Sequence, residues 1–203
     1  MEDQGQAPRL RPILRPGLDL IVVGYNPSLP AWRTGHYYAN PGNRFYRLLF
    51  DSGLTPGLLR PDEDWTLPAY GIGVTDLVPL PSARADQLPV ARFREAVAER
   101  LGELAELAPR AVCCNGLGVY RLLAGRDPMR PGLQPDHPAL PGIAVFAVPS
   151  SSGLVNGRTA ERLTAWKAVA RWLGRDSGSA SARSGGADCP VEATSTLIQN
   201  WLL

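Results

Sequence analysis

The sequence predicts an α/β domain built around a mostly parallel sheet. Four short apolar runs carry this prediction, because they are rich in β-branched residues and bounded by Gly, Pro or Asn. Three of them are almost continuously hydrophobic, as in strands that are buried on both faces of a parallel sheet. Helical patterns separate the runs, and strands that alternate with helices favour parallel pairing. The expected strands are residues 18–24, 71–78, 110–116 and 143–149.

The helices expected between these strands follow from the spacing of apolar residues. In residues 90–108, apolar side chains recur at intervals of three and four, and Arg and Glu fill the other face. Residues 157–173 repeat this pattern after the last expected strand. Shorter helices are expected over residues 43–50 and 116–123.

Length and composition divide the 203 residues into three parts. A chain of this length suits one domain with appendages, and we place that domain at residues 17–174. Residues 1–16 contain three prolines and are expected to form an extended arm. Residues 175–203 are expected to form a low-complexity, flexible tail, because Gly, Ser and Ala make up 11 of the 16 residues from 174 to 189.

Charge and cysteine content exclude several classes of protein. The net charge of +2 argues against a uniformly basic surface, so nucleic-acid binding would have to use local patches. No apolar run approaches the roughly 18 residues of a membrane span, and we expect no membrane partner. Cys113, Cys114 and Cys189 lack the spacing of a zinc site, an iron–sulfur site or a disulfide framework, which favours a reduced, cytosolic compartment.

The expected ligand site lies beyond the carboxyl ends of the strands, where open α/β sheets bind their ligands. In the first such loop, Gly24 would let a ligand approach the backbone, and Asn26 could orient a water molecule. Tyr37 and Tyr38 could stack on a flat heterocycle. The alternative is a proline-stiffened loop whose aromatic side chains pack on the core. The same rule selects three segments, 25–43, 75–82 and 150–157.

The segment after the last expected strand is rich in serine and leads into the last helix. Hydroxyl and amide groups at a helix N-terminus suit a phosphate, and Leu154 and Val155 stand where a wedge into a base stack would be. Arginines on the last helix and in residues 31–50 form local positive patches of the kind that phosphate contacts require. The alternatives are an ordinary serine-rich helix cap and solvated helix faces.

Several motifs, in the same order along the chain, carry a resemblance to a known family. Residues 24–27 read Gly-x-Asn-Pro, residues 35–45 read Gly-x-x-x-Ala-x-Pro-Gly-Asn-x-Phe, and Ser-Gly-Leu-Thr follows at 52–55. With Gly-Val-Thr-Asp-Leu-Val at 73–78 and Val-Pro-Ser-Ser-Ser-Gly-Leu at 148–154, the chain resembles the mismatch-specific uracil-DNA and thymine-DNA glycosylases of the uracil-DNA glycosylase superfamily. The resemblance implies a three-layer α/β/α fold with a central four-stranded parallel sheet.

The resemblance also implies roles for individual residues. Asn26 would position the attacking water, and Tyr38 would stack on the base after it leaves the duplex. Gly24 and Tyr25 would line the base pocket, and Asn43 and its turn would close it. No metal and no cofactor is expected. The residues expected to contact DNA are Ser150, Ser151, Ser152, Gly153, Leu154, Val155, Asn156 and Arg158.

Three residues depart from the family pattern. Tyr25 replaces the usual isoleucine, and Asn156 stands where one branch has arginine. Asp76 stands where lysine or asparagine is usual. We expect Asp76 to be catalytic with Asn26, because a carboxylate facing the sugar would stabilise an oxocarbenium charge or accept a proton from water. The alternative is that Asp76 caps a turn or pairs with Arg84.

The sequence thus leads to the hypothesis of a monofunctional DNA glycosylase. It would hydrolyse the N-glycosidic bond of uracil mispaired with guanine, with thymine or modified pyrimidines as further candidates. Its partner would be duplex DNA, with single-stranded DNA left open, and we expect a monomer in a bacterial cytoplasm, associated with the nucleoid. The alternatives are a nucleoside or nucleotide N-glycoside hydrolase and a catalytically weak protein that binds mismatches.

Overall fold

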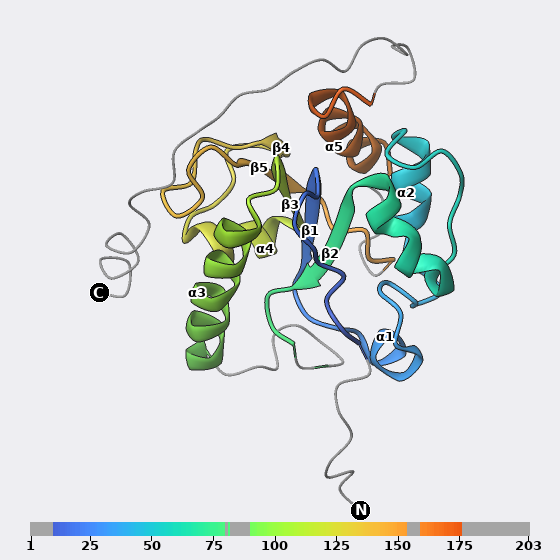
Figure 1. The fold of residues 1–203 in the computed structure, drawn as a ribbon, viewed down its shortest axis with the longest axis horizontal. Helices are drawn as coiled ribbons and strands as arrows, with labels where there is room; N and C mark the ends of the chain where they lie inside the picture. The colour runs from blue at the N-terminus through green and yellow to red at the C-terminus, as the bar shows by residue number, and fades with distance from the viewer. Residues whose placement is uncertain (1–9, 80, 82–89, 154–158, 176–203) are drawn as a thin grey trace, which may run out of the picture.

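The computed structural model describes residues 10–79, 81, 90–153 and 159–175. One sheet of five strands, in the order β2-β1-β3-β5-β4, forms the centre of the molecule (Figure 1). Strands β1, β2, β3 and β5 run parallel to one another, and β4 runs antiparallel to β5. The strands are β1 (Leu20–Gly24), β2 (Ile72–Asp76), β3 (Ala111–Asn115), β4 (Gly132–Leu133) and β5 (Ala144–Val148).

The four parallel strands are the four that the sequence predicts, but the prediction of a four-stranded sheet is wrong by one strand. The additional strand β4 has two residues, Gly132 and Leu133. Its backbone pairs with Ala147 and Phe146 at the edge of the sheet. A pair of residues is too short to show an alternating pattern, so no sequence signal marks this strand.

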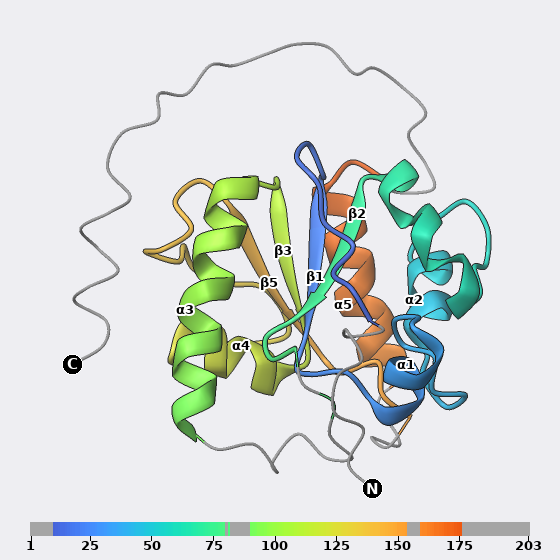
Figure 2. The same ribbon diagram turned by 60° about the horizontal axis from the view of Figure 1, so that its bottom comes forward.

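Helices cover both faces of the sheet, which confirms the expected α/β/α layers (Figure 2). The short α1 and the 3₁₀ helix η1 lie in segments for which the sequence shows no helical period. The helices are α1 (Leu29–Thr34), α2 (Phe45–Asp51), η1 (Pro61–Tyr70), α3 (Val90–Leu107), α4 (Leu117–Ala124) and α5 (Thr159–Trp172). None of those described is both long and apolar enough to cross a membrane.

Alternation of side chains along the strands produces two cores, one on each face of the sheet. Leu20 and Val22 of β1 pack with α2, η1 and α5. Ile21 and Val23 point the other way and pack with α3 and α4. Because the period along a strand is two, Gly24 continues the face of Leu20 and Val22. Its partner in the register is Asp76, the last residue of β2.

The packed part of the chain extends beyond residues 17–174 at both ends. Ile13 forms an antiparallel bridge with Val74, the two backbone hydrogen bonds measuring 2.9 and 3.0 Å. At the other end, Arg175 donates to Asp19 at 2.6 Å and to the Leu54 carbonyl at 3.4 Å. Residues 1–9 and 176–203 of the expected arm and tail lie outside the described residues.

We expect Arg175→Met to lower the stability of the fold. The Arg175 side chain is 16% exposed and that of Asp19 24%, so water only partly screens the ion pair between them. A hydrogen bond to a charged group is worth roughly 1.5–3 kcal/mol, and partial exposure should reduce the loss to about 1 kcal/mol. Thermal unfolding measures it. Lys167→Met, at an exposed position of α5, is the matched control, and an equal change in both variants would contradict the prediction.

Candidate active site

Polar side chains meet at the carboxyl ends of three neighbouring strands. Gly24 ends β1, Asp76 ends β2 and Asn115 ends β3. Gly24 pairs directly with Asp76, and the pairing of Val23 with Cys114 places Asn115 beside Gly24 on the other side. Asp76 and Asn115 are buried. The sheet therefore places a carboxylate, a glycine and an amide in one row.

The position that a side chain of Gly24 would take lies next to two side chains of the protein itself. A Cβ atom built on Gly24 would lie less than 3.0 Å from Asp76 Oδ1 and 3.3 Å from the hydroxyl oxygen of Tyr38. The absence of a side chain at this position is required by the carboxylate of β2. The close approach that we expect at Gly24 is made, among the described residues, by Asp76 and Tyr38.

Burial perturbs the Asp76 carboxyl strongly. Its pKa is raised from 3.8 to about 7, because removal from water disfavours the charged form. The positive charge of Arg100, on α3, opposes that rise. Among the described residues, Asp76 Oδ2 has no hydrogen-bond partner. Arg84, the alternative partner suggested by the sequence, lies outside the described residues. A carboxyl that titrates near neutrality is suited to acid–base work.

Tyr38 reaches this row from the loop between α1 and α2. Its ring lies against Phe45, with 4.0 Å between ring centroids and an angle of 31° between the planes. Its φ of +57° is uncommon for a residue with a side chain. Neighbouring residues therefore have to hold the loop in this conformation.

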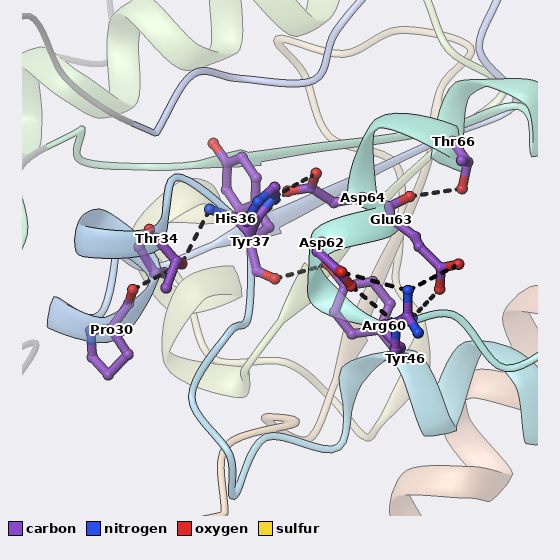
Figure 3. A network of polar contacts seen from close by, with 11 residues as sticks. Pro30, Thr34, His36, Tyr37, Tyr46, Arg60, Asp62, Glu63, Asp64 and Thr66 are labelled. Atoms are coloured by element: carbon purple, nitrogen blue, oxygen red, sulfur yellow. Dashed lines mark hydrogen bonds and ion pairs between the residues drawn. The ribbon is translucent and has the colours of Figure 1, made fainter.

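The buried carboxylate of Asp64, on η1, helps to hold the loop in this conformation (Figure 3). Asp64 Oδ2 accepts a hydrogen bond of 2.9 Å from the backbone N–H of Tyr37, and Asp64 Oδ1 lies 3.1 Å from His36 Nδ1. The Tyr46 hydroxyl donates to the Tyr37 carbonyl at 2.8 Å. Sequence reasoning missed Asp64, because it stands in the acidic run 62–64 and nothing in the sequence separates it from its exposed neighbours.

The other predicted pocket residues have different surroundings. Asn26 is half-buried two residues after the end of β1, with its amide nitrogen 3.4 Å from the Pro27 carbonyl oxygen. The Tyr25 side chain packs against the core on the α3 and α4 face, away from Tyr38. Asn43 lies two residues before α2, and its Oδ1 accepts a hydrogen bond of 3.0 Å from the backbone N–H of Phe45, the first residue of that helix. Asn26 and Asn43 thus flank the loop that carries Tyr38.

The serine-rich loop is tied to the strand ends through Asn115, a second residue that sequence reasoning missed. Asn115 Oδ1 accepts from the Ser151 backbone N–H at 2.9 Å, and Asn115 Nδ2 donates to Ser151 Oγ at 2.8 Å. The Ser151 carbonyl accepts from the backbone N–H of Arg44 at 2.9 Å. Ser151 is 1% exposed, so its hydroxyl serves the protein's own structure. In the sequence, Asn115 is only the polar end of an apolar run.

Two glycines bring the serine-rich loop and the Pro41–Asn43 turn into direct contact. A Cβ atom on Gly153 would lie less than 3.0 Å from the Gly42 carbonyl oxygen. A Cβ atom on Gly42 would find the Gly153 Cα at 3.8 Å, an ordinary van der Waals distance. The other hydroxyls of this loop remain partly exposed, with the Ser152 N–H donating to Ser150 Oγ at 3.2 Å. Leu154, Val155, Asn156 and Arg158 lie outside the described residues.

The expected positive patches are partly used inside the protein. Arg162 of α5 is 1% exposed, and its guanidinium lies 3.4 Å from the Ser152 carbonyl oxygen. Arg47 pairs with Asp51 at 2.8 Å. Arg44 is exposed and donates to Thr159 Oγ1 at 2.8 Å, beside the serine-rich loop. Arg44 and Arg162 both lie next to the expected DNA contacts, and of the two only Arg44 is exposed.

The described residues contain no group of three or more His, Cys, Asp or Glu side chains that could hold a metal ion. The fold and the site together define an α/β protein whose polar groups gather at the carboxyl edge of a parallel sheet. The sequence model of the uracil DNA glycosylase superfamily matches residues 12–174, and the chain belongs to that superfamily. Membership implies a hydrolase that removes bases from DNA in repair.

A solved structure shows the same fold. The solution NMR structure of a candidate uracil DNA glycosylase from Methanosarcina acetivorans superposes with a TM-score of 0.56 at 25% sequence identity. The match covers 81% of this chain and 96% of that chain. The resemblance that the motifs suggest is therefore confirmed for the superfamily.

We expect Gly153→Ala to impair the site and Gly42→Ala to leave it intact. The first substitution forces apart two backbones that cannot yield at low cost, whereas the second has room. Overpacking of this kind costs roughly 1–3 kcal/mol. Thermal unfolding and base-release assays should both show the asymmetry. Equal effects of the two substitutions would mean that the loops do not depend on this contact.

We expect Asp76→Asn to gain thermal stability relative to the wild type as the pH rises. The folded protein holds the Asp76 proton up to about pH 7, whereas the unfolded chain releases it near 3.8. The free energy of unfolding therefore falls as the pH rises between these values, and an amide avoids that loss. Melting temperatures of both proteins from about pH 5 to pH 8 measure the effect. A constant difference across that range would contradict a buried, ionising Asp76.

Proposed function

We propose that this protein is a monofunctional DNA glycosylase of the mismatch-specific branch of its superfamily. It hydrolyses the N-glycosidic bond of uracil opposite guanine and leaves an abasic site, the first step of base excision repair. The observation that carries the proposal is the convergence of Asp76 and Tyr38 on Gly24, two residues before Asn26. The motif over residues 24–45 supports the assignment to this branch.

In the proposed reaction the target base first leaves the duplex. Unstacking costs least at a mismatch, and this favours uracil or thymine opposite guanine, and modified pyrimidines, over paired bases. The Tyr38 ring then stacks on the flipped base with one face. Phe45 packs against the other face of the Tyr38 ring, with 4.0 Å between the two ring centroids. The turn of Asn43 closes the pocket, and the backbone around Gly24 and Tyr25 lines it.

The proposed chemistry divides the work between an amide and a carboxylate. Asn26 holds the attacking water, but a neutral amide cannot accept its proton. Asp76 accepts that proton while the water oxygen bonds to the sugar carbon. The glycosidic bond breaks at the same time, and its electron pair leaves with the base, which later takes up a proton from solvent. The Asp76 charge also stabilises the oxocarbenium character of the transition state.

The proposed DNA contacts lie on the serine-rich loop and at the start of α5. Ser150, Ser152 and the amides near Gly153 meet phosphates, with the exposed Arg44 beside them. Leu154 and Val155 fill the space that the flipped base leaves, and Asn156 and Arg158 extend the contact. We propose a monomer that acts on duplex DNA in the bacterial nucleoid, without a metal or cofactor.

Release of uracil from three substrates tests this function. The substrates are a duplex with one G·U pair, the same strand alone, and free deoxyuridine. The proposal expects the fastest release from the duplex. Release from free deoxyuridine at an equal rate would instead identify a nucleoside hydrolase. Tight binding to the G·U duplex without release would identify a mismatch-binding protein.

We expect Asn26→Ala and Asp76→Asn each to slow base excision by about 10²-fold or more, the usual worth of an acid–base or water-positioning group. Both variants should bind the G·U duplex within a few-fold of the wild type. In the wild type, the rate should rise with pH through about 7, because the base form of Asp76 is the active one. Single-turnover kinetics measure these rates. Wild-type excision by Asp76→Asn would leave Asn26 acting alone.

A further inference from the structure

The hydroxyl of Tyr38 has a position that its stacking role does not require. The oxygen is buried and forms no hydrogen bond of normal geometry with the described residues. It lies 3.3 Å from the same point beside Gly24 that Asp76 Oδ1 approaches even more closely. A phenylalanine would stack on Phe45 and on a base equally well. A buried hydroxyl without a partner costs free energy, so the extra oxygen calls for a function.

The surroundings of the hydroxyl restrict what that function can be. On one side stands Asp76, whose Oδ2 also lacks a partner among the described residues. On the other side stands Asn115, whose amide bonds to Ser151 and also interacts with the Tyr38 hydroxyl, which opposes the rise in the pKa of Tyr38. The Asp76 carboxylate adds to burial in raising the pKa of Tyr38, so the phenol keeps its proton and remains a donor. The donor and the carboxylate therefore share one buried space.

We propose that the Tyr38 hydroxyl is a positioning group that donates a hydrogen bond to the Asp76 carboxylate once that group has lost its proton. This inference rests on the proposed function of Asp76. The hydrogen bond turns the carboxylate toward the water held by Asn26 and favours its charged form. Asp64 and the backbone of the 36–38 loop keep the hydroxyl in place.

Two other titratable groups interact with Asp76, so they also bear on its pKa. Arg100 of α3 is the cation that faces the carboxylate and favours its charged form. Tyr37, from the same loop as Tyr38, is buried and protonated, with its pKa raised by burial and by Asp76. Neither group changes in a Tyr38 variant. A shift in the titration of Asp76 on loss of the hydroxyl therefore reports the proposed hydrogen bond.

Tyr38→Phe removes the hydroxyl and keeps the ring. Without a donor to its charged form, Asp76 should titrate at a higher pH, and the rise of the excision rate should move to higher pH with it. We expect a rate about 10-fold below wild type at pH 6 on a G·U duplex and a smaller difference at pH 9. Titration of the Asp76 side-chain carboxyl by ¹³C NMR measures the same shift without any substrate.

Two controls separate this role from a structural one. Tyr46→Phe also removes a buried hydroxyl from this network, the one that binds the Tyr37 carbonyl. It should lower the melting temperature and leave the midpoint of the pH–rate profile unchanged. In an Asp76→Asn background, Tyr38→Phe should have no further effect on the rate, because the group through which it acts is gone.

The outcomes distinguish this inference from the function on which it rests. An unchanged titration of Asp76 in Tyr38→Phe overturns the hydrogen bond, whatever the activity of Asp76. An equal loss of rate at every pH, in both the wild-type and the Asp76→Asn backgrounds, also overturns it and places the hydroxyl on the substrate. Wild-type excision by Asp76→Asn refutes the catalytic role of Asp76 alone, and the NMR titration then still decides the contact.

Discussion

The contact between Gly24 and the Asp76 carboxylate is the constraint on which the rest of the site depends. Parallel pairing of β1 and β2 places the two residues side by side on one face of the sheet. The carboxylate lies where a side chain of residue 24 would be, so the first strand has to end in glycine. Burial between the strands and the Tyr38 loop keeps water from the carboxyl and raises its pKa to about 7.

The loops around this contact are held by polar groups that have no part in the proposed chemistry. Asp64 fixes the backbone before Tyr38, and Asn115 fixes Ser151. The Gly42–Gly153 contact then joins the Pro41–Asn43 turn to the serine-rich loop. The first two contacts are hydrogen bonds between a side chain and the backbone, and the third is packing of one backbone on another. A movement of the serine-rich loop on binding DNA would therefore displace the Pro41–Asn43 turn as well, because these contacts hold the two segments together.

The sequence predicts most of the fold and only part of the site, for physical reasons. Four buried strands and the longer helices have patterns of many residues, so local periodicity reveals them. The strand β4 and the helix η1 are held by tertiary contacts and have no such pattern. Asn26 and Tyr38 are candidates because of the motif that follows the first strand, and Asp76 is one because of its place near the end of the second. Asp64 and Asn115 are not, because each is defined by a partner about 28 to 36 residues away.

The environment of Asp76 also links the stability of the protein to its proposed chemistry. An exposed aspartate titrates near 3.8, too acidic to take a proton efficiently from water at neutral pH, whereas the buried one titrates at about 7. The same desolvation weakens the fold whenever the group is charged. Arg100 reduces this cost, and so would the proposed hydrogen bond from Tyr38, at the expense of basicity. A higher pKa makes Asp76 a stronger base for the proposed reaction, whereas a lower pKa reduces the cost of its charge to the fold. Arg100 and the proposed hydrogen bond from Tyr38 both lower this pKa and so set the compromise between the two.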